Sequence, residues 1–206
     1  ILRFNYAPKN NYNLLDKSMW SVNWEKKIDY IEYQFSQMSK KYKNISEGIN
    51  YYLGIWENAI SYYNDNVILK QEVKFVCHKR LGINTDLLEF LNPLNFVIDY
   101  KERDIGDYLK SYIINEKYTF DKLKKNLNKL SHDKNDASRL ITRIMFPSFY
   151  FDKYEEIIIN EEDDKSILLF NTKTDNYEDF LRFIFNYYKN LGLPYLTWLF
   201  ENKKED

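Results

Sequence analysis

A strand-like apolar run that ends in basic residues interrupts a chain whose other apolar residues recur mostly at helical spacing. Val73, Phe75 and Cys77 alternate with Lys74 and Val76, which is the period of an extended strand. His78, Lys79 and Arg80 follow that run directly. We therefore expect a strand that delivers ionisable side chains into a loop at its carboxyl end.

A second strand is predicted a short way further along the chain. Asn92-Pro93 is a turn signal, and the apolar run Phe96–Ile98 after it stops at Asp99. The stretch from Val73 to Leu109 thus combines two strands with clustered charges. We expect the rest of the chain to fold as helices around it.

This stretch resembles the spore-coat kinase-like proteins of the CotS and YutH group, relatives of the aminoglycoside and choline kinases. Such kinases carry a catalytic loop of His-Gly-Asp type, a strand pair, a magnesium-binding aspartate and a helix that opens with another aspartate. Cys77 to Leu81 resembles the loop, Ile98-Asp99-Tyr100 the metal-binding position, and Arg103 to Leu109 the helix start. The resemblance covers most of the chain. It implies a mostly α (α+β) fold, the carboxyl-terminal lobe of a kinase-like protein, with two to four short strands in a helical bundle.

The candidate site residues are His78, Arg80 and Asp99, and the pattern at this site is degenerate. Arg80 stands in the place of the catalytic aspartate, and Asn84 is one residue early for the usual asparagine. An arginine cannot act as a general base because its pKa is too high. It would instead attract an anion, by about 4 kcal/mol for unit charges at about 4 Å and an effective dielectric of about 20. Asp99 remains the candidate magnesium ligand.

We expect Arg80 to form an ion pair with Asp99. Such a pair would occupy the volume that magnesium and phosphate use in an active enzyme, and it would favour the ionised carboxylate. The pKa of Asp99 is then expected below that of an ordinary aspartate. On this hypothesis, Arg80→Asp removes the occluding cation.

Apolar stripes at spacings of three and four predict most of the helices. The expected helical segments are 24–38, 45–63, 104–113, 123–130, 140–145, 149–158, 175–187 and a short one near 195–199. The first two should form an antiparallel pair of long helices. Pro147 ends or kinks one helix, and Gly192 with Pro194 ends the last long one.

Several helix ends carry recognisable signals. Asn44 with Glu47 predicts a cap for the second helix, and Asp175 with Glu178 does so for the last long helix. The expected role of Asp104 is to lie at a helix amino terminus. Two further segments complete the interpretation: Val67–Leu69 as a short strand, and the acidic run 161–164 as a solvated turn.

Composition limits the function classes. The 206 residues suit one domain, with 1–22 as an irregular start and 23–206 as the lobe, and 44% hydrophobic residues with 18% aromatics indicate a globular protein. A net charge of −1 provides no positive field for nucleic acid. The single cysteine, Cys77, favours a reducing compartment, and no apolar run is long enough for a membrane helix or signal segment. A cytoplasmic or spore-coat location is expected, without membrane contact.

A nucleotide-binding lobe is not recognisable in the sequence. Its five glycines lie too far apart to form a loop that cradles phosphates. Since the chain starts at Ile1 and not at methionine, we expect a missing upstream part. Magnesium and ATP are therefore expected as cofactors only if an upstream lobe completes the site.

Histidine chemistry has weaker support. The simplest interpretation of His78 is a packed histidine at a strand end, and that of His132 is a surface residue in a polar loop. Ser131, His132 and Asp133 are contiguous, so they do not form a catalytic triad easily. The spacing of the histidines and Cys77 does not match a zinc site.

Three functional hypotheses follow. The first is a degenerate kinase-like lobe that acts as a binding or scaffold module, associated with the spore coat as the resemblance implies and with a protein partner there. The second is an active small-molecule phosphotransferase in which Asp86 or Asp104 replaces the missing base. The third is a helical interaction domain unrelated to kinases, whose aromatic residues bind a protein partner. The candidate aromatic residues are Trp20, Tyr51, Tyr62 and Tyr195.

Overall fold

The protein is mostly helical, as the sequence predicts. The computed structural model describes residues 13–68, 73–115, 119–130 and 132–201. Its long helices are α1 (Trp20–Met38), α2 (Lys43–Asn66), α4 (Glu102–Ile114), α6 (Lys134–Met145), α7 (Ser148–Asn160) and α9 (Thr174–Tyr187). Shorter ones are α3 (Leu87–Leu91), α5 (Phe120–Leu127), α8 (Leu168–Asn171), α10 (Thr197–Glu201) and the 3₁₀ turns η1 (Pro93–Asn95), η2 (Asp164–Ile167) and η3 (Lys189–Leu191). None of the described helices is both long and apolar enough to cross a membrane.

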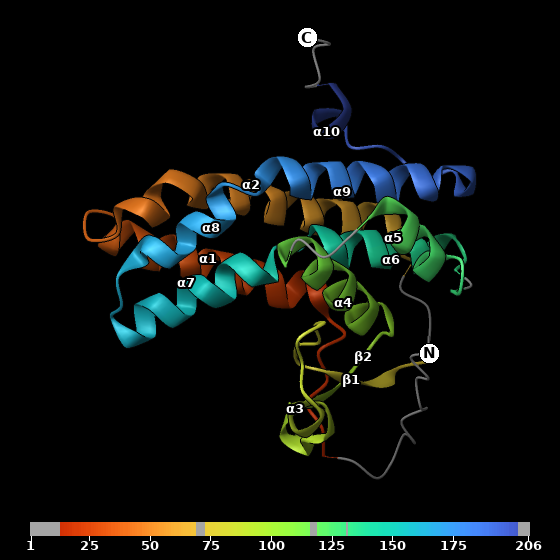
Figure 1. Ribbon diagram of the computed structural model, residues 1–206, viewed down its shortest axis with the longest axis horizontal. Coiled ribbons are helices and arrows are strands. Elements are labelled where there is room, and N and C mark those ends of the chain that lie inside the picture. The colour runs from red at the N-terminus through yellow and green to blue at the C-terminus, as the bar shows by residue number, and fades with distance from the viewer. Residues whose placement is uncertain (1–12, 69–72, 116–118, 131, 202–206) are drawn as a thin grey trace.

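The helices form a body from which a small β-unit projects. Figure 1 shows α2, α6, α7 and α9 running across the body, while β1 (Phe75–His78), β2 (Phe96–Asp99) and α3 lie on one side beyond α4. The predicted pair of long helices is confirmed, although α1 begins at Trp20, before the expected end of the irregular start. Helix α4 connects the two parts, because it packs on both α6 and β1.

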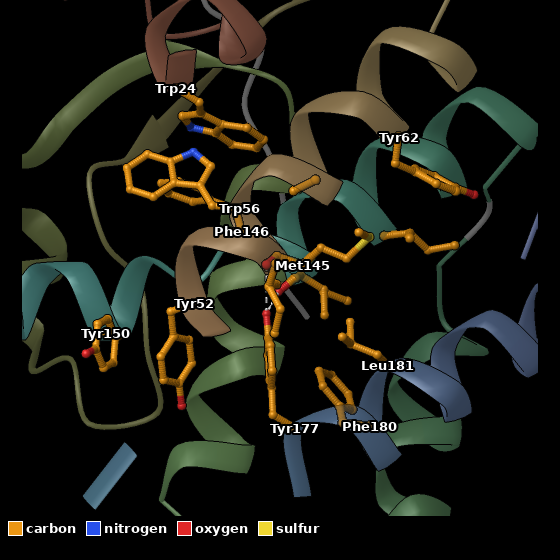
Figure 2. Packing of buried hydrophobic residues seen from close by; sticks show 14 of the residues in the cluster. Trp24, Tyr52, Trp56, Tyr62, Met145, Phe146, Tyr150, Tyr177, Phe180 and Leu181 are labelled. Atoms are coloured by element: carbon orange, nitrogen blue, oxygen red, sulfur yellow. Dashed lines mark hydrogen bonds between the residues drawn. The ribbon is translucent and has the colours of Figure 1, made fainter. Parts of the chain in front are cut away.

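Aromatic side chains fill the core of the helical body. Figure 2 shows Trp24, Trp56 and Phe146 converging from three helical regions. The Phe146 ring stacks on Trp24 with centroids 4.2 Å apart and meets Trp56 edge-on at 4.9 Å. Such contacts add to the free energy of burial. The hydroxyl of buried Tyr177 donates to the Met145 carbonyl at 3.0 Å, which satisfies a polar group inside this core.

The two predicted strands pair antiparallel. Phe75 lies opposite Asp99, and His78 lies opposite Phe96. Consequently His78 and Asp99 are at opposite ends of the strand pair and do not meet directly. The segment before α1 covers the other edge of β2: Ile98 donates to the Leu15 carbonyl at 3.0 Å and accepts from Lys17 at 2.8 Å.

Residues at the ends of α2 differ from the prediction. Asn44 and Glu47 do not cap α2, since Asn44 lies inside the helix. Asp164, expected in a solvated turn, is instead buried and accepts from the backbone N–H of Asn44 at 2.8 Å and of Ile45 at 3.2 Å. Residues 67 and 68 form no strand, and Leu69 lies outside the described residues.

The prediction for α9 is wrong at the start of the helix and agrees with the structure after its end. The helix begins at Thr174 without a side-chain cap, so the predicted pairing of Asp175 with Glu178 is wrong. Its far end follows the prediction: after η3 the chain reaches Gly192 at φ 64°, a conformation that glycine adopts without strain. Pro194 follows two residues later, after both α9 and η3 have ended.

Candidate functional site

Asp99 is completely buried at the end of β2, and both of its oxygens are occupied. Oδ1 accepts from Trp20 Nε1 and from the Tyr100 backbone N–H, each at 2.8 Å. Oδ2 accepts from Arg103 Nη1 at 2.8 Å. Burial raises the pKa of Asp99 above its ordinary value and outweighs the opposing effect of Arg103. The expected lowering of this pKa is therefore wrong.

Arg103 is the side chain that joins the two strands. Besides its bond to Asp99, its Nε donates to the His78 carbonyl at 2.7 Å and its Nη2 to the Lys79 carbonyl at 2.9 Å. The guanidinium has a rigid fork of donors, so one residue of α4 can satisfy three acceptors at once. Arg103 thereby fixes the end of β1 relative to the end of β2.

His78 is held by α4 on one side and α3 on the other. Its Nδ1 donates to Asp104 Oδ2 at 2.7 Å, its Nε2 faces the Phe90 carbonyl at 3.2 Å, and its backbone N–H donates to Asp104 Oδ1 at 2.9 Å. Both ring nitrogens thus face acceptors, which favours the imidazolium form. The hydrogen bond with Asp104 raises the pKa of His78. Asp104 lies in the first turn of α4 as predicted, and it also anchors β1.

Arg80 does not contact Asp99. Its guanidinium forms a two-point ion pair with Asp152 of α7, and its Nη1 donates to the Lys79 carbonyl at 2.8 Å. Both partners of the ion pair are partly exposed. The predicted Arg80–Asp99 pair is therefore wrong, and the cation beside Asp99 is Arg103.

A second layer of buried charges lies between α4 and α6. Arg143 donates to both oxygens of Asp107, at 3.0 and 2.7 Å, and Lys110 Nζ lies 3.1 Å from the same carboxylate. Burial raises the pKa of Asp107, but Arg143, Lys110 and Arg80 outweigh it and leave that pKa below its ordinary value. Burial also lowers the pKa of Lys110 to about 7. A side chain on Gly106 would collide with Arg143, since an added Cβ lies 2.8 Å from its Cγ.

A third buried carboxylate belongs to Glu102. Arg139 Nε donates to its Oε2 at 3.2 Å, whereas Oε1 makes no hydrogen bond to the described residues and lies 3.8 Å from Lys101 Nζ. Burial raises the pKa of Glu102 to about 7. The interior around α4 therefore holds acids and bases arranged mainly as mutual partners.

The remaining sequence candidates lie apart from this cluster. His132 is half-buried and hydrogen-bonded to the Tyr188 hydroxyl, so it is not the surface residue expected, and burial lowers its pKa to about 4. Ser131 lies outside the described residues. Asp86 is exposed and caps α3 by accepting from the Glu89 N–H at 2.8 Å. Asn84 bonds Asn115.

Comparison with known proteins identifies the family. Residues 4–184 match the model of a family described as "Spore coat putative kinase YutH". The chain belongs to this YutH family. It is 26% identical over 208 aligned residues to the endospore coat-associated protein YutH of Bacillus subtilis (strain 168). That alignment covers 87% of this chain and 61% of the relative, so the chain spans about three fifths of the relative's length. No solved structure was found to match.

As its side chains stand, the site of this YutH-family chain does not fit magnesium. Both oxygens of Asp99 already accept hydrogen bonds, and both Arg103 and Arg143 act on it electrostatically. Among the described residues no three His, Cys, Asp or Glu side chains are grouped so as to hold a metal ion. No catalytic step through a magnesium nucleotide is derived from this arrangement.

Sequence reasoning missed the partners that define the site in this YutH-family chain. Arg103 lies four residues after Asp99, a spacing that could have suggested an ion pair. Arg139 pairs with Glu102, and Arg143 pairs with Asp107. The two arginines are four residues apart on α6, and the two carboxylates are five residues apart on α4. Asp152 lacked any local signal, because it comes from a helix distant in the sequence.

Proposed function

We propose that this chain is a kinase-like lobe of the spore coat that binds a protein partner and does not transfer phosphate. Membership of the YutH family supports the kinase-like, coat-associated part of this proposal. The printed description of the Bacillus subtilis relative supports the coat association. The finer statement, that the lobe is degenerate, depends on the geometry around Asp99.

The observation that carries the proposal is the enclosure of Asp99. In the kinases that the sequence resembles, the aspartate at this position offers oxygens to magnesium. Here the carboxylate is completely buried and receives three hydrogen bonds, one of them from Arg103. A divalent cation would have to displace a buried arginine, which would then be left without its partner charge.

The position of Arg80 supports the same conclusion. It stands where the catalytic base would be expected, and Asp152 holds it by two contacts. Asp104, one replacement base considered, is buried and engaged by His78, so it is not free to accept a proton from a substrate. Asp86, the other, is exposed but caps α3. These contacts support the part of the proposal that excludes phosphate transfer.

Nucleotide binding and turnover test this proposal. ATP is titrated calorimetrically into the full-length protein with and without magnesium, and phosphate release is followed with sugar, choline and aminoglycoside acceptors. We expect no magnesium-dependent binding and no turnover, and Asp99→Asn should leave both readouts unchanged. Magnesium-dependent ATP binding and turnover that Asp99→Asn abolishes would overturn the proposal and favour the phosphotransferase.

A further inference from the structure

Four exposed leucines lie close together in the segment that connects the two strands of the β-unit. Leu87, Leu88 and Leu91 of α3 and Leu94 of η1 are 69, 82, 58 and 76% exposed. They account for four of the 15 exposed large hydrophobic side chains in the described part of the chain, within eight consecutive residues. Apolar residues scattered singly on a surface are normal, but a contiguous group marks an interaction site. We call these four residues the leucine surface.

The local structure holds the leucine surface open. Phe90 stacks on His78 with ring centroids 4.6 Å apart, and Leu87, three residues earlier, lies on the same side of α3 and lines the adjoining pocket with it. Leu88, two residues before Phe90, lies on the opposite side of the helix. Asp86 caps α3, and Asn92 accepts from the Leu94 N–H at 3.0 Å. These bonds order the backbone without covering the leucines. A pre-ordered surface loses less conformational entropy on binding.

A pocket adjoins the leucine surface. It has a volume of about 360 Å³ and lies between Leu87 and Phe90 of α3, the loop at Leu81 and Ile83, and Tyr108 of α4. This size lies within the range of sites that accept small apolar groups, about 300–1,000 Å³. A row of exposed leucines beside an apolar pocket suits the apolar face of a helix, with one large side chain anchored in the pocket.

The charges around this surface indicate which kind of helix it fits. The charged side chains within the leucine segment itself, from Leu81 to Ile98, are Asp86 and Glu89. Exposed Lys79 borders the other end of the segment, where its backbone N–H donates to the Asn95 carbonyl at 2.7 Å. Both carboxylates are exposed, and neither forms a salt bridge with another described residue. Opposite charges across an interface steer association and fix orientation. The complementary partner therefore carries basic residues beside its apolar face.

We propose that the leucine surface and its adjoining pocket bind a basic amphipathic helix of a partner protein. Its large apolar side chains cover the leucines, and its lysines or arginines lie beside Asp86 and Glu89. This inference rests on the proposed function, because it assigns a surface and a chemistry to the partner of the scaffold.

Labelled synthetic helices test the inference by fluorescence anisotropy. One peptide has leucines at i, i+3, i+4 and i+7 with lysines elsewhere, and a second has glutamates in place of the lysines. We expect the lysine peptide to bind at least about tenfold more tightly than the glutamate peptide, with an affinity that falls as salt is added. Equal binding of the two peptides, or no binding, would overturn the inference.

Matched variants locate the binding surface. Leu88→Glu should weaken binding of the lysine peptide by about tenfold or more, since it places a charge at the centre of the apolar face. Ile159→Glu is the control, because Ile159 is 78% exposed on α7, and it should bind like the wild type. Glu89→Lys should weaken binding and flatten its salt dependence, whereas Glu57→Lys, on exposed α2 surface, should not. Equal losses in Leu88→Glu and Ile159→Glu would contradict the proposal.

Two further readouts separate the alternatives. Circular dichroism shows whether each variant is folded, and sedimentation shows whether the chain self-associates. A dimer that Leu88→Glu dissociates would overturn the inference, because a second copy would then occupy the leucine surface. Failure of the peptide tests leaves the nucleotide result unaffected, so the loss of this inference is distinguishable from the loss of the proposed function.

Discussion

Arg103 of α4 donates to Asp99 at the end of β2, with Nη1 and Oδ2 2.8 Å apart. Both side chains are at least nine-tenths buried. The carboxylate with the strongest resemblance to a metal ligand is thus neutralised by a cation four residues further along the chain. The same guanidinium also holds the carbonyls at the end of β1. Occlusion of the site and attachment of the β-unit are consequently properties of one side chain.

Replacing Arg103 should lower the free energy of unfolding of the protein. Arg103→Met leaves Asp99 buried without its cation and two carbonyls without their donor, so we expect the free energy of unfolding to fall by about 3–5 kcal/mol. Urea denaturation followed by circular dichroism measures this loss. Lys41→Met is the control, because its exposed pair with Glu161 spans 3.8 Å, and it should change stability by less than about 1 kcal/mol. Equal effects of the two changes would contradict this account of Arg103.

The two histidines should titrate far apart. The hydrogen bond with Asp104 raises the pKa of His78 above 6.5, whereas burial lowers that of His132 to about 4. Proton NMR of the imidazole resonances gives both values, and His132→Gln assigns them. Since the folded pKa of His78 is raised, its contribution to stability is present below about pH 6.5 and is lost as the pH rises through the folded pKa. The opposite order of the two titrations would refute this interpretation.

Reversing the Arg80–Asp152 pair should restore what each single change removes. Arg80→Asp and Asp152→Arg each place like charges together, while the double variant rebuilds the pair in reverse. Because both side chains are partly exposed, we expect a coupling free energy of about 0.2–1 kcal/mol from the double-mutant cycle. Magnesium affinity measured by calorimetry should not rise in Arg80→Asp, since Arg80 does not contact Asp99. A rise would show that Arg80 does occlude the metal position.

Two glycines within helices should respond oppositely to alanine. In Gly106→Ala the new Cβ would lie 2.8 Å from Arg143 Cγ and 3.1 Å from its Cβ, so α4 and α6 must separate and stability should fall. Gly54→Ala meets nothing within 4 Å and should raise stability by about 0.5–1 kcal/mol through helix propensity. Thermal unfolding of both variants compares them. A stable Gly106→Ala protein would mean that the interface between α4 and α6 is not tightly packed.

Glu102 should make stability depend on pH below neutrality. Burial raises its pKa from 4.5 to about 7, so the folded state holds a proton that the unfolded state releases. The contribution of Glu102 to the free energy of unfolding is therefore fully present below about pH 4.5, and it is lost as the pH rises through about 7. Urea midpoints at pH 5 and pH 8 should therefore differ more in the wild type than in Glu102→Gln. The same pH dependence in both proteins would exclude Glu102 as its source.

The sequence predicted the elements better than their connections. Apolar spacing located the long helices and both strands, because burial of one face determines the pattern in each of them. Caps were harder to predict, since the amino terminus of α2 is satisfied by Asp164, from a turn far along the chain. Trp20 and Tyr62, suggested as surface aromatics, are buried, whereas Tyr195 is 49% exposed. Periodicity does not tell which side of an aromatic helix faces the solvent.

The sequence predicted where the candidate site residues lie, but not which residues they contact. His78, Arg80 and Asp99 all lie at the β-unit, as expected from the strand ends. Antiparallel register, however, puts His78 and Asp99 at opposite ends of the strands, and that register depends on the loop between them. The partner of Arg80 comes from α7, so it emerges only once the helical body packs against the loop.

The segment before α1 gives the β-unit a folding constraint. Backbone bonds from residues 15 and 17 hold Ile98, and Trp20 reaches Asp99 across 79 positions of sequence. Contacts at such separation require closure of a large loop before they stabilise anything, and topologies rich in them fold slowly. The β-unit is therefore completed by contacts with a segment about 80 positions earlier in the chain, and we expect its full stability to depend on the docking of that segment and of α1.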